Sequence, residues 1–195
     1  MKILTLTFFL ILLSGCKNAN NESNNEHTPV TKIDKTPELI QELKDQSTIG
    51  DQFSILYDKF EPILDRSDSL TGPDENADGI RDDIEAFIEA LEVTEPVRKA
   101  LKQDAKQTQE NLYHDFSEKN DANIDKALEI ADKYNKVLAC KTFVGILVDD
   151  VINTSRTIEA LTYNTKSRTM AYLTYNNLLD GSVSISLPAE EKYCE

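Results

Sequence analysis

The chain has 195 residues, of which 35 are acidic and 21 are basic, so its formal net charge is −14. This length fits one domain, and a hydrophobic share of 39% is enough to build a core, which argues against wholesale disorder. The acidic balance argues against a nucleic-acid binder, because phosphate recognition needs clustered Lys and Arg, and against charge-driven docking on anionic lipid.

The N-terminus carries the pattern of a secretory signal. Met1 and Lys2 form a short basic start, and the apolar run Ile3–Leu13 is too short for a bilayer-spanning helix, which needs about 20 residues. The run ends in Leu13–Cys16, with the small residues Ser and Gly before the Cys. We therefore expect residues 1–15 to be removed as a signal peptide.

Leu13–Cys16 resembles the lipobox of bacterial lipoproteins. The resemblance implies cleavage after Gly15 and a diacylated Cys16 as the new N-terminus. Two or three acyl chains would give the stable membrane anchoring that one chain does not. By resemblance to Gram-negative lipoproteins, Lys17 favours the outer membrane, with the protein facing the periplasm. The alternative is an ordinary signal peptide followed by a chance Cys.

Residues 17–36 are rich in Asn and poor in apolar side chains, so 16–36 is predicted to be the lipidated Cys and a flexible tether. One Lys leaves with the signal peptide, so the mature chain holds 20 basic against 35 acidic residues, a net charge of −15. From Thr36 onward the pattern becomes helical, and one helical domain is predicted over 37–195.

Helix signals follow one another along this domain. Thr36-Pro37 and Thr94-Glu95-Pro96 each place a capping residue before a proline, which predicts two helix starts. Apolar residues at helical spacing predict the core-facing side of a further helix, and they are Ile84, Phe87, Ile88 and Leu91. Similar spacing predicts helices near 124–138 and 165–179.

The C-terminal third contains two further signals. The most apolar part of the mature chain, 143–161, is predicted to be a buried central helix. Val183–Pro188 alternates like a strand but has no partner strand, so an extended tail is expected. The predicted fold is all-α, with five to seven helices, one calcium loop and a disulfide-pinned tail. Tyr163, Tyr172 and Tyr175 are expected to be half-buried packing residues rather than a ligand surface.

One loop carries a chemical motif. Residues 74–85 match the pattern D-x-[DN]-x-[DN]-G-x5-E at every specified position. Ca²⁺ takes six to eight oxygen ligands, and Gly79 allows the positive φ that turns the chain around an ion. The expected ligands are the carbonyl of Ile80 and the side chains of Asp74, Asn76, Asp78, Asp82 and Glu85. The alternative is a solvated acidic loop whose Asp82 and Asp83 only favour a helix N-terminus.

The loop resembles those of EF-hand, dockerin and thrombospondin type 3 proteins. It departs from the EF-hand because Arg81 stands where paired EF-hands place an apolar residue, and because Gly72-Pro73 cannot end an entering helix. No second loop of this kind occurs. The resemblance therefore implies a static calcium site rather than a sensor. Residues 164–181 resemble C-terminal segments of proteobacterial lipoproteins that carry one such loop and have no assigned activity.

Cys140 and Cys194 remain once Cys16 is assigned to lipid, and this even pair predicts a disulfide in an oxidising compartment. The alternative, a nucleophilic Cys acting with His114, has no support in spacing.

The sequence contains no motif of a known hydrolase, nucleotide-binding or zinc-protease site, so no enzyme is expected. The leading hypothesis is a lipid-anchored, calcium-stabilised structural or binding module of the bacterial envelope. One alternative is a periplasmic inhibitor or immunity-type lipoprotein that masks a basic protein partner. The other is an unrecognised hydrolase with perturbed carboxylates in a pocket.

Overall fold

The computed structural model describes residues 32–195, so the signal peptide, Cys16 and most of the predicted tether lie outside the described residues. Seven α-helices and three short 3-10 segments make up the regular structure of 32–195, and this part of the chain contains no strand. The α-helices are α1 (Pro37–Lys44), α2 (Ile49–Phe60), α3 (Asp82–Ala90), α4 (Glu95–Glu110), α5 (Asp121–Phe143), α6 (Val148–Thr162) and α7 (Lys166–Leu178). The prediction of an all-α fold with five to seven helices is confirmed.

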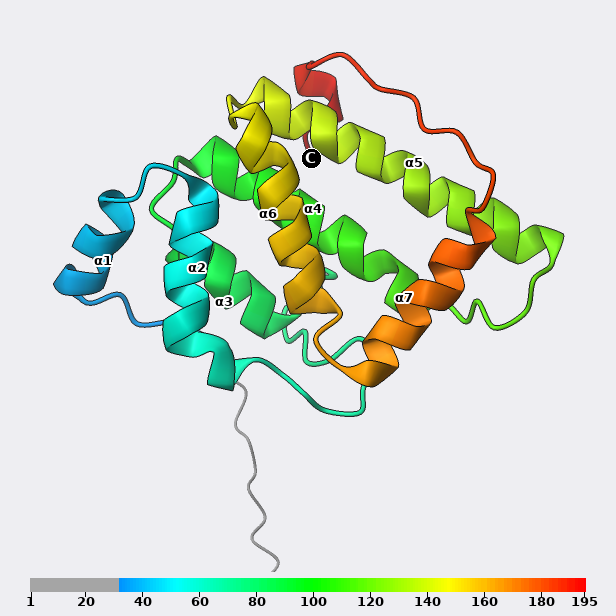
Figure 1. The fold of residues 1–195 in the computed structure, drawn as a ribbon, viewed down its shortest axis with the longest axis horizontal. Coiled ribbons are helices and arrows are strands. Elements are labelled where there is room, and N and C mark those ends of the chain that lie inside the picture. The colour runs from blue at the N-terminus through cyan, green and yellow to red at the C-terminus, as the bar shows by residue number, and fades with distance from the viewer. Residues whose placement is uncertain (1–31) are drawn as a thin grey trace, which may run out of the picture.

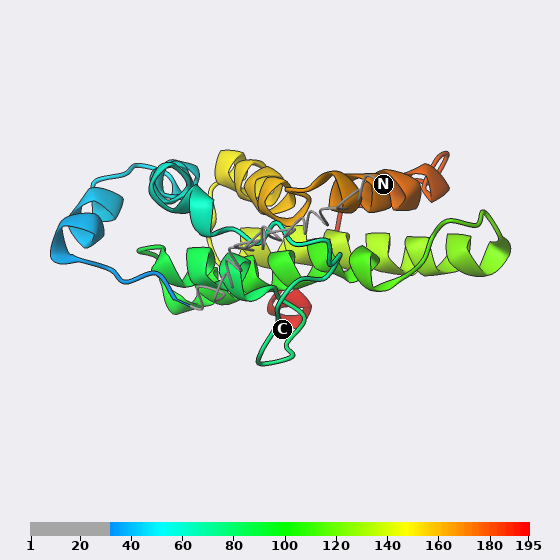
Figure 2. The ribbon, with the colours of Figure 1, turned by 90° about the horizontal axis from the view of Figure 1, so that it is seen from below.

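The helices form two layers. Figure 2 shows α2, α6 and α7 in one layer and α3, α4 and α5 in the other, with α1 at one end. Helix α4 lies at the centre, because it contacts α3, α5 and α6 (Figure 1). The long connection between α2 and α3 passes outside the second layer, and it contains the first part of loop 74–85, whose last four residues belong to α3.

Local sequence signals set several helix starts. The hydroxyl of Thr36 accepts a hydrogen bond from the backbone N–H of Leu39 at 3.2 Å, as expected for a cap before Pro37. Asn120 caps α5 through the N–H of Asn123 at 2.9 Å. Helix α4 begins at Glu95 after Thr94, as predicted, although Thr94 makes no side-chain cap. Short polar caps thus define where these helices begin.

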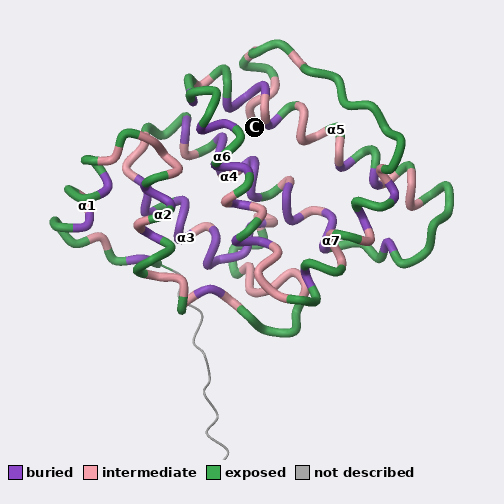
Figure 3. The backbone as a smooth tube through the Cα atoms, in the orientation of Figure 1, coloured by how far each residue is buried: buried purple, intermediate pink, exposed green. Residues whose placement is uncertain are grey.

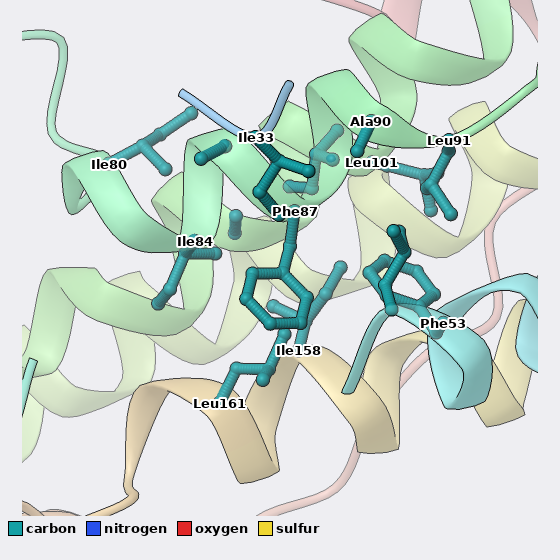
Figure 4. Packing of buried hydrophobic residues seen from close by; sticks show 14 of the residues in the cluster. Ile33, Phe53, Ile80, Ile84, Phe87, Ala90, Leu91, Leu101, Ile158 and Leu161 are labelled. Atoms are coloured by element: carbon teal, nitrogen blue, oxygen red, sulfur yellow. The ribbon is translucent and has the colours of Figure 1, made fainter. Parts of the chain in front are cut away.

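The principal core lies between the two layers. Ile84, Phe87, Ile88 and Leu91 are all fully buried, which confirms the predicted apolar face of α3. Figure 4 shows Phe87 pointing from α3 toward Ile158 and Leu161 of α6. Burial of side chains of this size stabilises the fold by roughly 1.5–3 kcal/mol each, so this contact fixes α3 and the loop before it.

The folded domain begins earlier than predicted. Ile33 is only 5% exposed and lies beside Phe87 in the core (Figure 4), and Lys35 pairs with Glu92 at 2.7 Å. The predicted tether therefore extends too far, because its last residues pack on the domain. A single Ile in a polar stretch gives no periodic signal, so composition could not reveal this contact.

The predicted buried helix over 143–161 is wrong in its first half. Helix α5 ends at Phe143, Gly145 adopts φ 87°, and α6 begins at Val148. The apolar residues at this corner are partly or largely exposed: Phe143 46%, Leu147 68%, Val148 77% and Ile152 41%. The apolar run predicts one helix, whereas a glycine in the left-handed region ends one helix and allows the next to start.

The C-terminal tail is extended, as predicted. Residues 183–186 are exposed and belong to no helix or strand (Figure 3). Cys194 is bonded to Cys140 near the end of α5, with a Cα–Cα distance of 5.0 Å. The disulfide prediction is confirmed, and the tail is fastened to α5.

Candidate functional site

Loop 74–85 is closed at its base by a backbone hydrogen bond. The N–H of Asp82 donates to the carbonyl of Pro73 at 3.0 Å, so the first residue of α3 lies against the residue that precedes the loop. No helix enters the loop, because residues 64–81 are non-helical in this structure. This matches the expectation from Gly72-Pro73 and separates the loop from an EF-hand.

The acidic side chains of the loop bind its own backbone. Asp74 accepts from the N–H groups of Asp78 and Gly79 at 3.2 and 2.9 Å, and Asp78 accepts from the N–H of Ile80 at 2.9 Å. Gly79 has φ 90°, as its position predicts, and Ala77 also has a positive φ of 55°. These bonds curl the chain into a compact turn with its oxygens directed inward.

Three of the expected ligands meet at one point. The side-chain nitrogen of Asn76 lies 3.1 Å from an Asp78 carboxylate oxygen and 3.2 Å from a Glu85 carboxylate oxygen. Glu85 lies in the first turn of α3, so the helix brings it to the two loop residues. The carbonyl oxygen of Ile80 accepts no hydrogen bond from the described residues.

Asp82 is the most unusual member of the set. One carboxylate oxygen accepts from the N–H of Glu75 at 3.1 Å, while the other is buried and has no hydrogen-bond partner in the described residues. Asp82 is 6% exposed. A carboxylate oxygen in this situation loses hydration without replacement, so a bound cation would compensate for that loss.

A lysine occupies the outer side of the cluster. Lys102 of α4 lies 2.7 Å from Glu85 and 2.5 Å from Glu89. Burial lowers the pKa of Lys102, but hydrogen bonds to these two carboxylates outweigh it and hold the pKa above its usual value. Over residues 32–195 no group of three or more His, Cys, Asp or Glu side chains is arranged to hold a metal. Asn76 directs its side-chain nitrogen toward Asp78 and Glu85, and Lys102 is paired with Glu85. Binding of a cation therefore requires the Asn76 amide to rotate so that its oxygen faces these carboxylates.

Arg81 explains the departure from the EF-hand pattern. Its guanidinium is fully buried and forms an ion pair with Asp83 at 2.5 Å. It also donates to the carbonyls of Leu161 and Thr162 at the end of α6, at 2.9 and 3.3 Å. The residue that would face a partner loop in an EF-hand instead connects this single loop to α6.

Gln109 of α4 is a second anchor that the sequence did not indicate. Its side-chain oxygen accepts from the N–H of Arg81 at 3.2 Å, and its nitrogen donates to the carbonyl of Gly79 at 3.2 Å. Gln109 is 1% exposed. The sequence gives no signal for this contact, because the partners of Gln109 lie 28 and 30 residues earlier in the chain.

A second polar cluster lies inside the helical body. Lys141 is fully buried and donates to Asp104 at 2.6 Å, to the carbonyl of Val151 at 2.8 Å and to the hydroxyl of Ser155 at 2.8 Å. These three bonds occupy all the protons of a charged ammonium group. Because Ser155 is 2% exposed and Lys141 holds its protons on fixed acceptors, the cluster joins α4, α5 and α6 rather than activating a nucleophile.

No protein-family model matches this chain, and neither do curated protein sequences or solved structures. Within residues 32–195, no helix combines the length and apolar character needed to cross a membrane. The disulfide occupies Cys140 and Cys194, so neither offers a free thiol to act with His114 while the bond is intact.

Proposed function

We propose that this protein is a lipid-anchored, non-enzymatic structural or binding module of the bacterial envelope that holds one structural Ca²⁺ in loop 74–85. The observation that carries the calcium assignment is the buried oxygen of Asp82 that has no hydrogen-bond partner among the described residues, in a loop rich in carboxylate oxygens. Hard cations prefer such oxygens, and Ca²⁺ accepts the flexible, many-ligand geometry of a loop better than Mg²⁺. The ligands are the carbonyl of Ile80 and the side chains of Asp74, Asn76, Asp78, Asp82 and Glu85.

The proposed role of the ion is static. The loop already connects to α3 through Asp82 and Glu85, to α4 through Gln109 and to α6 through Arg81. A cation would neutralise the repelling carboxylates and hold this connection together. Extracellular calcium modules bind at roughly 10⁻⁴–10⁻³ M, so we expect a stabilisation of about 1–3 kcal/mol when Ca²⁺ is in excess.

Thermal unfolding of residues 17–195 tests the site, in EDTA and in about 2 mM CaCl₂. Calcium should raise the midpoint of the parent chain, and Asp74→Ala and Glu85→Ala should abolish the rise. Asp82→Asn is the sharpest variant, because it keeps the side-chain shape and removes one charge. In EDTA it should change stability by less than about 1 kcal/mol, since relief of repulsion opposes loss of the helix-terminus interaction. In calcium, Asp82→Asn should lose most of the rise in unfolding midpoint that the parent chain shows.

Asp68→Asn is the matched control, because Asp68 is exposed in the same connection between α2 and α3. Its calcium response should equal that of the parent chain. Superimposable unfolding curves with and without Ca²⁺ would leave the loop as a charged turn and refute the assignment.

The anchor is proposed from Leu13–Cys16, which lies outside the described residues. The measurement is cell fractionation of the full chain with mass analysis of its mature N-terminus. Wild-type protein should sediment with the outer membrane and carry acyl mass on Cys16, and Cys16→Ser should be unacylated. Unmodified Cys16 in the mature wild-type protein would refute the anchor.

A further inference from the structure

A cavity of about 340 Å³ opens between α4, α5, α6 and α7, apart from loop 74–85. Ligand pockets for small molecules begin near this size. Its wall combines aromatic rings, amides and one acidic residue. The lining residues used below are Asn111, Tyr134, Glu159, Tyr163, Tyr172 and Tyr175.

Four tyrosines form the aromatic part of the wall. Tyr163 and Tyr172 are stacked, with ring centroids 4.5 Å apart and an interplanar angle of 24°. Burial raises the pKa of Tyr134, Tyr163 and Tyr175 above the ordinary value, so the phenols stay neutral at physiological pH. Neutral tyrosine rings present electron-rich faces, which attract cations.

Glu159 is the only carboxylate among the residues that line this cavity. It is partly buried, and no Lys, Arg or His of the described residues lies within ion-pair distance of it. Arg156, one turn earlier on α6, lines a different cavity beside α2. Lys141 is committed to Asp104, Ser155 and Val151. Glu159 therefore lacks a direct counter-ion, and burial and the charge of Asp104 raise its pKa, so a bound cation would stabilise its charged form.

Asn111 holds one tyrosine of the wall in place. Its side-chain oxygen lies 3.1 Å from the hydroxyl of Tyr163, and that hydroxyl also donates to the carbonyl of Thr108 at 2.7 Å. Asn111 is 2% exposed, and its side-chain nitrogen has almost no accessible surface. The ring of Tyr163 is therefore fixed by two polar neighbours.

We propose that this cavity binds a small organic ammonium ion. The cation lies against the tyrosine rings and pairs with Glu159. This site goes beyond the calcium loop and does not depend on it. A single carboxylate also provides no acid–base pair, so the geometry fits binding better than the hydrolase alternative.

The C-terminal tail borders the mouth of the cavity. Ser182 and Ser184 belong to its lining and are exposed, and the hydroxyl of Ser184 donates to the side chain of Asn135 on α5 at 2.7 Å. Figure 1 shows the tail running from the end of α7 to α5, and Ser182 and Ser184 place its first part at the cavity. Farther on, the tail is held by the side chain of Gln103, which donates to the carbonyl of Tyr193 at 2.9 Å, and by the disulfide.

The test is titration of the calcium-saturated protein by NMR with choline, tetramethylammonium and 1,4-diaminobutane. At least one ammonium probe should bind with a Kd below about 1 mM and shift the signals of pocket residues. Choline's neutral isostere 3,3-dimethyl-1-butanol should bind at least about tenfold more weakly, because it lacks the charge. Glu159→Gln should weaken the affinity for the ammonium probes by a similar factor.

Two matched variants separate binding from folding. Tyr172→Leu should weaken binding of the ammonium probe, because it removes the aromatic ring. Tyr172→Phe keeps the ring and should retain binding. Glu38→Gln removes the same charge on α1 at the opposite end of the molecule and should leave binding unchanged (Figure 1). Equal affinity for the neutral isostere, or no shifts at about 10 mM of any ammonium probe, would overturn the proposal.

Discussion

Three basic side chains, Arg81, Lys141 and Arg168, are fully buried. Each is paired with one carboxylate, from Asp83, Asp104 and Asp65 respectively. Removing one member of such a pair leaves an uncompensated buried charge, which is destabilising by about 3–5 kcal/mol. These pairs therefore define the arrangement of loops and helices rather than adding large net stability.

Asp65 should make stability depend on acid pH. Its burial raises the pKa, but hydrogen bonds from Arg168 and Ser67 outweigh burial and hold the pKa of Asp65 below its usual value. A depressed pKa contributes stability above the unfolded-state pKa of about 4, and that contribution is lost as pH falls through the folded-state value. Asp65→Asn should destabilise the fold by about 1–3 kcal/mol at pH 7, less than loss of a fully buried partner, because the Asp65 side chain is 18% exposed and Asn keeps an acceptor oxygen. Its difference from the parent should shrink below about pH 4 in urea unfolding.

The control is Asp68→Asn, which removes an exposed carboxylate three residues later and should have little effect at either pH. A difference for Asp65→Asn that stays constant with pH would show that shape, not charge, determines its contribution.

In the proposed calcium site, Lys102 would compete with the ion for Glu85. Its ammonium lies 2.7 Å from the carboxylate, so Lys102→Met should remove a positive charge and free the Glu85 ligand. We expect calcium affinity to rise about tenfold, as simple charge repulsion at this range predicts. Calorimetric titration with CaCl₂ measures it, with Lys99→Met, exposed on the same helix, as the control. An unchanged or weaker affinity would contradict the proposed involvement of Glu85.

At the scale of elements, Gly72 determines how the connection between α2 and α3 meets Arg81. It has φ 69°, and a Cβ there would lie 2.3 Å from Cδ of Arg81. Gly72→Ala should therefore displace the buried guanidinium in addition to straining the backbone. We expect a loss of about 3 kcal/mol or more, measured by urea unfolding.

Gly181 offers a matched control for this substitution. Its φ of 81° is similar, but nothing lies within 4 Å of an added Cβ. Gly181→Ala should lower the free energy of unfolding by the backbone strain alone, about 1–2 kcal/mol. Equal losses for the two variants would mean that contact with Arg81 contributes nothing.

The sequence predicted elements best where the signal is local. The α3 stripe and the Thr36 and Thr94 helix starts depend on residues within a few positions, and the structure bears them out. The boundary at Gly145 was missed because an apolar run conceals a turn. Asp150 was missed for a different reason: its carboxylate binds the N–H groups of Ile49 and Gly50 at the start of α2, about 100 residues away.

The candidate calcium loop shows the same division. Its residues and its Gly79 turn follow from spacing, and Asn76, Asp78 and Glu85 do meet in the structure. Its attachment to Gln109 and its competition with Lys102 come from α4 and have no sequence signature. The tyrosine cavity was likewise hidden, because rings from α5, α6 and α7 become neighbours only after the helices pack.

At the scale of the whole molecule, the disulfide joins α5 to the last residues of the chain. Replacing both cysteines, as Cys140→Ser with Cys194→Ser, removes a cross-link with a sequence separation of 54 residues. The chain-entropy relation gives a loss of about 4 kcal/mol for a loop of this size. Thermal unfolding should show a lower midpoint for the double variant.

Adding a reductant supplies the internal check, because it should lower the midpoint of the parent protein toward that of the double variant and leave the variant unchanged. A parent midpoint equal to that of the variant under oxidising conditions would show that the cross-link does not contribute to stability.

The same bond sets the path of a mechanical load. A pull applied between Lys32 and Glu195 would run along the backbone to Cys140 and then cross to Cys194. Helices α6 and α7 lie on the segment that the bond bypasses. Helices α1 to α4 and the loop before α3 would extend under force, while α6 and α7 would stay in a closed ring and carry no direct tension.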